Sequence, residues 1–141
     1  RFSRASDCGV ASVVRRRLTP GMKLTADMLV GVVALLHVYF LVLEMFLWTK
    51  PYGLRTFKLT PEKAETTKSL AANQGLYNGF LAAGLGWGLL AGADGHAIKV
   101  FFLSCVIIAG VFGAATANRK ILWVLAVPGA IALGLVCLTN Q

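Results

Sequence analysis

The segment Met28–Trp48, MLVGVVALLHVYFLVLEMFLW, is apolar except for one histidine and one acidic residue. A helix needs roughly 20 such residues to cross a hydrocarbon core that is ~30 Å thick. Three further stretches of similar length and character follow it, Ser69–Ala91, Ala97–Ala117 and Ile121–Thr139. The sequence therefore predicts an all-α fold, a bundle of four transmembrane helices.

The composition supports a membrane protein with one domain. Of the 141 residues, 57% are hydrophobic and only 14% are charged, and the mean hydropathy is +0.70. Soluble domains have about 45–50% apolar and about 25% charged residues. The four spans leave no room for a second soluble domain, so we expect residues 22–141 to form a single integral membrane domain.

The first 21 residues, RFSRASDCGVASVVRRRLTPG, differ from the rest of the chain. They are rich in arginine and serine and poor in acidic residues, as targeting sequences often are. We expect natural translation to begin at Met22. Residues 1–21 would then be a disordered or non-native extension, and no fold is predicted for them.

The basic residues lie beside the spans, which argues against nucleic acid as a partner of this +8 chain. In that position Lys and Arg normally set the orientation of membrane proteins and lie near anionic lipid. From Met22 onward, the first and third connections hold seven basic residues and the other side holds two. This predicts that both termini lie outside, whereas counting residues 1–21 gives seven on each side and no preference.

Local signals predict where the helices end and bend. The tetrapeptide Lys50-Pro51-Tyr52-Gly53 is expected to end the first span, because proline and glycine terminate helices. Thr60-Pro61-Glu62 is typical of a helix start near Pro61, with a capping side chain and an acid near the positive helix end. Pro128-Gly129 lies near the middle of the fourth span and predicts a kink there.

Four polar residues interrupt the second span within the stretch LAANQGLYNGFLAAG, Leu70–Gly84. At about 100° per residue they share one sector of the helix, roughly 140° wide. A separate face carries small residues, including Gly75 and Gly79, and would let another helix approach closely. The four polar residues are Asn73, Gln74, Tyr77 and Asn78.

His37 and Glu44 are the strongest candidates for chemistry. They are seven residues apart in the first span, so both leave the same helix face, separated by about 10.5 Å along the axis. Trp48 continues that stripe. An acid at a helix centre in the membrane costs roughly 2.5–3.5 kcal/mol, which favours a functional role. The alternatives are that Glu44 reaches interfacial water or a lysine, and that His37 is a neutral imidazole bonded to a neighbouring carbonyl or amide.

No metal or cofactor is expected. One histidine and one carboxylate two turns apart do not form a coordination set. The sequence contains no nucleotide-binding or phosphate-binding motif, and its cysteines, Cys8, Cys105 and Cys137, lack metal or redox spacing.

The first two spans are antiparallel neighbours joined by a short connection. Residues at equal depth in the membrane can therefore be paired by counting away from that connection along each span. If Trp48 lies level with Lys68, Asn73 should stand beside Glu44 and Asn78 beside His37. Gln74 and Tyr77 would then fill the gap between Glu44 and His37.

Two segments, LEMFLWTKPYGLRTF and LTPEKAETTKSLAANQGLYNGFLAAGLGWGLL, carry a resemblance to a known family. From Met22 to the C-terminus the chain closely resembles the small bacterial membrane proteins classed as domain of unknown function 1304. The resemblance implies a four-helix protein of the bacterial inner membrane with no established activity. The family motif falls on Glu44, Asn73, Gln74, Tyr77 and Asn78.

These features favour an intramembrane pocket for a small, largely apolar molecule. Glu44 and His37 would be the catalytic candidates for proton transfer or isomerisation without a cofactor, and whether the protein is an enzyme stays open. The ligand-binding candidates are Asn73, Gln74, Tyr77, Asn78 and Trp48. The alternatives are a small permease subunit that uses Glu44 as its coupling acid, or a structural or assembly protein. Self-association through the small-residue helix faces is a further expectation.

Overall fold

The computed structural model describes residues 4–139, without the side chains of residues 4–19 and of Ala93. In the described range the chain is helical and has no strand. The elements are α1 (Arg4–Met45), α2 (Pro51–Phe57), α3 (Pro61–Leu90), the 3₁₀ turn η1 (Gly92–Asp94), α4 (Gly95–Thr116), the π-helix η2 (Leu122–Ala126) and α5 (Val127–Leu138). The all-α prediction is confirmed, but the count of four helices is not exact, because the first connection folds into α2.

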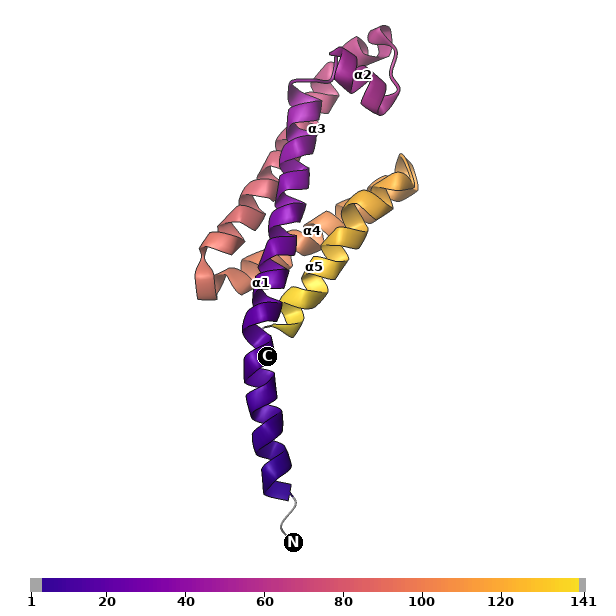
Figure 1. Ribbon diagram of the computed structural model, residues 1–141. Helices are drawn as coiled ribbons and strands as arrows, with labels where there is room; N and C mark the ends of the chain where they lie inside the picture. The colour runs from indigo at the N-terminus through magenta and orange to yellow at the C-terminus, as the bar shows by residue number, and fades with distance from the viewer. Residues whose placement is uncertain (1–3, 140–141) are drawn as a thin grey trace.

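Four of these helices pack as a ring. α1 contacts α3 and α5, α3 contacts α4, and α4 contacts α5. Figure 1 shows α3 running beside α1, while the N-terminal part of α1 projects beyond the other helices. Toward the α2 end, α5 with η2 diverges from α1. α1 and α3 stay in contact near α2, while α5 with η2 separates from α1 there; the opposite end, where α5 approaches α1, is the converging end of the bundle.

The apolar core lies in the converging half. It is built from fully buried side chains of all four long helices, and Phe102, Leu81 and Leu133 pack around it. The buried members are Ala26, Val30 and Val33 of α1, Leu85 of α3, Leu103 and Val106 of α4, and Ala132 and Val136 of α5.

Large apolar side chains also cover the outside of the molecule. Leu35 is 68% exposed, Phe112 69% and Leu90 89%. Within the described residues, two helices are long and apolar enough to cross a membrane, Pro20–Met45 and Gly95–Thr116. Soluble monomers rarely expose large contiguous apolar patches, so this exterior indicates association with a membrane.

The sequence signals at the start of α3 act as expected. α3 begins at Pro61, and the side chain of Thr60 accepts a hydrogen bond from the Lys63 backbone N at 3.3 Å. The first span differs from its prediction, because α1 ends at Met45 rather than Trp48. Pro51 then starts α2, where its ring suits the first helical turn.

Two further features differ from the expectations. Residues 4–21, for which no fold was expected, continue α1, and Pro20 lies inside this helix. Arginine favours helix, and five of the residues before Pro20 are arginines. Near Pro128, the expected site of a kink, the chain forms the π-helix η2. Proline cannot donate the usual backbone hydrogen bond, and the altered helical register directly precedes it.

Candidate functional site

The buried stripe of α1 becomes polar toward the α2 end. Val30 is fully buried, His37 is 1% exposed, and Glu44 is half-buried. These three residues recur every seven positions, so they follow one face of the helix. α3 has a matching stripe in which Asn78 occupies a buried position between Ala71 and Leu85. Each helix thus replaces an apolar core residue with a polar one in the same region of the bundle.

Glu44 and Asn78 meet directly. The Asn78 side-chain Nδ2 donates a hydrogen bond to Glu44 Oε2 at 2.7 Å, and it also lies 3.3 Å from the Gln74 backbone oxygen. Asn78 is 9% exposed. A carboxyl oxygen can accept this bond whether the group is ionised or protonated. This contact joins α1 to α3 within an otherwise apolar interface.

Two glycines of α3, Gly75 and Gly79, let α1 and α3 approach closely beside the Glu44–Asn78 bond. A Cβ added at Gly75 would lie 2.7 Å from Met45 Cγ and 3.1 Å from Glu44 Cβ. One added at Gly79 would lie 2.7 Å from Leu41 Cδ1. The two distances of 2.7 Å are shorter than real Cβ contacts, so the neighbouring side chain would have to shift. The Gly75-xxx-Gly79 face therefore serves packing within the chain, against α1.

His37 is bonded within its own helix. Its Nδ1 lies 2.8 Å from the Val33 carbonyl oxygen, one turn earlier, which makes Nδ1 the donor. The expected position of Asn78 beside His37 is corrected by the structure, since Asn78 bonds Glu44. His37 thus matches the alternative of an imidazole bonded to a neighbouring carbonyl.

The pairing of α1 and α3 residues predicted from equal depth is wrong by about one helical turn. Gly79 lies beside Leu41, whereas the count placed it beside His37. The count assumed that α1 continued as a helix to Trp48, but it ends at Met45. Trp48 instead lies in the connection, where its Nε1 donates to Thr67 Oγ1 at 3.1 Å.

The other three polar residues of α3 are not brought to Glu44. Asn73 and Gln74 are exposed, and Tyr77 is 54% exposed, with its ring at the edge of Phe80. The polar sector spans roughly 140°, which is wider than the ~100° stripe that a helix usually buries. Only Asn78 falls inside the buried stripe.

An ion pair at the converging end was not predicted. Lys99 Nζ of α4 lies 2.7 Å from Asp27 Oδ1 of α1, and the Lys99 side chain is 8% exposed. A Cβ on Gly88 of α3 would collide with the Lys99 stem, so that glycine makes room for it. Both charged residues lie at the ends of apolar stretches, and of the two only Lys99 was counted above, among the basic residues beside the spans. The only indication of this pair in the sequence is that Asp27 and Lys99, 72 positions apart, carry opposite charges.

Among the described residues, no group of three or more His, Cys, Asp or Glu side chains lies together in a way that could hold a metal ion. The polar groups of the site are one carboxylate, one amide and one imidazole. Such groups bind by hydrogen bonding and can exchange protons.

Comparison with known proteins supports the resemblance seen in the sequence. The family described as "Protein of unknown function (DUF1304)" matches residues 31–137. The "Uncharacterized protein YpaA" of Lactococcus lactis subsp. lactis (strain IL1403) is 30% identical over 92 residues, which cover 64% of this chain and 77% of that protein. No solved structure matches. The chain belongs to the DUF1304 family of proteins of unknown function.

Proposed function

We propose that this chain is a multi-pass protein of the bacterial inner membrane and that Glu44 and Asn78 form the polar wall of an intramembrane site for a small, largely apolar molecule. The observation that carries the proposal is the 2.7 Å bond between Asn78 and Glu44 at an otherwise apolar interface. Ligand sites typically combine apolar walls with a few convergent polar groups. An acid inside a membrane span is costly, so its presence favours a role beyond packing.

The site has the groups needed for proton transfer without a cofactor. Glu44 would accept or return a proton at a bound molecule, since carboxylates serve as general acids and bases. Asn78 would hold the carboxylate in place through its side-chain amide. His37 lies two turns deeper on the same stripe, so its part would be to exchange protons with the site through the ligand or a bound water.

A small permease subunit is the second candidate, and the separation of the helices favours it. α5 diverges from α1 near the α2 end, while Asp27 and Lys99 bind each other where the helices converge. α1 and α5 thus approach each other at one end of the bundle and separate at the other, an asymmetry of the kind that alternating access uses. Glu44 would then be the coupling acid. In a third candidate, a structural or assembly protein, the same bond would only fix α1 against α3.

The proposed topology places both termini outside when the chain is counted from Met22. The connections at the α2 end and between α4 and η2 hold seven basic residues, and such residues favour the cytoplasmic side. A reporter fused after Gln141 should therefore be accessible from outside the cell. Accessibility only from the cytoplasm would reverse this topology.

The substitution Glu44→Gln separates the candidates, with Glu65→Gln as a control because Glu65 is exposed. Small molecules that co-purify with each protein would be measured by untargeted mass spectrometry. A molecule retained by the parent and by the Glu65→Gln variant but lost from Glu44→Gln would support the site. Equal retention by all three proteins would reject it. Proton-coupled uptake in vesicles, lost only in Glu44→Gln, would favour the permease.

A further inference from the structure

We propose that the α2 end of the molecule is a cationic platform that binds the anionic headgroups of membrane phospholipids. The platform consists of Lys50, Arg55 and Lys58, which are carried by α2 and the residues beside it. The inference rests on the membrane placement proposed above, but it uses none of the residues of the Glu44–Asn78 site.

A few side-chain contacts tether α2 to the rest of the molecule. The rings of Trp48 and Phe57 are 4.7 Å apart, and Trp48 also donates to Thr67 of α3. The hydroxyl groups of Tyr39 and Tyr52 lie 3.0 Å apart and join α1 to the start of α2. These contacts at both ends of α2 fix the direction in which it presents its side chains.

The exposed surface of α2 carries positive charge. Lys50, Arg55 and Lys58 are all exposed, and no acidic residue lies between Lys50 and Thr60. Arg55 Nε donates to the Pro51 carbonyl oxygen at 3.2 Å, which orients the guanidinium on the helix surface. Because guanidinium has five N–H donors, its terminal groups can still bind a phosphate.

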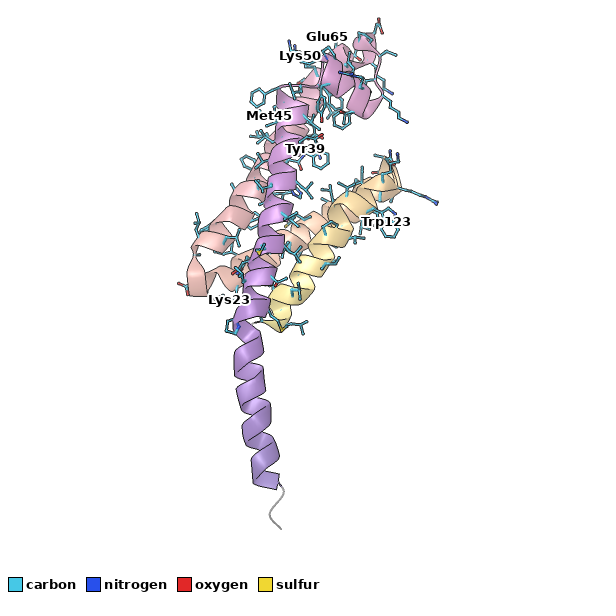
Figure 2. The ribbon with its side chains drawn as sticks, viewed as in Figure 1. Lys23, Tyr39, Met45, Lys50, Glu65 and Trp123 are labelled. Atoms are coloured by element: carbon cyan, nitrogen blue, oxygen red, sulfur yellow. The ribbon has the colours of Figure 1, made fainter. Side chains whose placement is uncertain are left out.

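The neighbouring charges leave the platform positive. On α3, Glu65 lies 3.6 Å from Lys68, and Glu62 is in the first turn, beside the exposed Lys63. Residues 50–68 therefore hold five basic and two acidic side chains. Figure 2 shows Lys50 and Glu65 together at this end and Lys23 at the other end of the bundle.

Apolar side chains beside the charges favour a lipid over a soluble anion. Tyr52 is 49% exposed and Phe46 is 63% exposed, and both lie next to the basic residues in the chain. A phosphate group offers the acceptor oxygens for the platform, while acyl chains offer a surface for these rings. A basic helix with aromatic residues at the level of the headgroups is typical of interfacial helices. The occupant is therefore an anionic phospholipid of the adjacent leaflet.

Quenching of Trp48 fluorescence tests the proposal at the platform itself. Substituting Trp87→Phe and Trp123→Phe in the full chain leaves Trp48, in contact with Phe57, as the only tryptophan. The protein would be reconstituted into phosphatidylcholine bilayers with increasing fractions of brominated phosphatidylglycerol, and in parallel with brominated phosphatidylcholine. The ratio of the two quenching constants measures the preference for the anionic lipid. We expect this preference to be clear in the parent protein.

The triple variant Lys50→Gln/Arg55→Gln/Lys58→Gln should lose that preference. Each basic residue near an anionic surface contributes roughly fivefold to lipid attraction, and screening by salt reduces this, so the ratio should fall on the order of tenfold. The charge-conserving variant Lys50→Arg/Lys58→Arg should keep the parent ratio. Lys23→Gln, at the opposite end, should keep it as well.

Three results would overturn the proposal. They are equal quenching by both lipids in the parent, an unchanged ratio in the triple variant, and loss of the preference in the presence of inorganic phosphate. The last would show that the platform takes a free anion rather than a lipid. Absence of quenching by either lipid would instead refute the membrane placement, so the two failures are distinguishable.

Discussion

Removal of the carboxylate of Asp27 should destabilise the protein strongly. In Asp27→Asn the Lys99 ammonium, whose side chain is 8% exposed, loses the partner that lies 2.7 Å away. Removing one member of a buried pair costs about 3–5 kcal/mol. Since the Asp27 side chain is 32% exposed, water reaches part of the site, and we expect a loss just below that range, about 2–3 kcal/mol. Reversible unfolding by a denaturing detergent, followed by circular dichroism, measures the loss.

The double variant Asp27→Asn/Lys99→Met tests the reason for this loss. It removes both charges and keeps an unbranched side chain over Gly88, so it should lie within about 1 kcal/mol of the parent. Lys23→Gln, a nearby exposed lysine, should be neutral. The reasoning fails if the double variant is as unstable as the sum of the two single variants, because the two groups would then not interact.

Three other predictions concern packing and local hydrogen bonds. Gly75→Leu should lower the free energy of unfolding in detergent by about 1–3 kcal/mol through overpacking. Gly86→Leu should be nearly neutral, because a Cβ at Gly86 meets open space. Equal losses in the two variants would refute the close contact of α1 and α3. Thr60→Ala should cost about 1 kcal/mol by the same measurement, and Thr60→Ser should restore most of it. Trp48→Phe, which keeps a ring but loses the bond to Thr67, should cost about 1 kcal/mol, and an unchanged stability would contradict that bond.

Much of the fold is predictable because its causes are local. The signals at Thr60 and Pro61 gave the start of α3 correctly, since capping depends on residues within one turn. The seven-residue spacing of His37 and Glu44 placed both on the buried side of α1. Helical class, core face and helix starts all follow from such short-range patterns.

The remaining features depend on contacts that no local pattern contains. α2 was missed because Pro51, which was expected only to end a helix, also begins one. The register of α1 against α3 depends on where α1 ends, which no local pattern fixed, and the partner of Glu44 is Asn78 rather than the expected Asn73.

Cross-linking of cysteines placed at positions 44 and 78 is the most direct test of the Glu44–Asn78 contact. The native cysteines would be replaced by alanine, and a short homobifunctional thiol reagent would be added to membranes that contain the full chain. The structure predicts rapid cross-linking in Glu44→Cys/Asn78→Cys and little in Glu44→Cys/Asn73→Cys, because Asn78 faces Glu44 and Asn73 is exposed elsewhere on α3. Preferential cross-linking of position 44 to position 73 would contradict the contact and, with it, the proposed site.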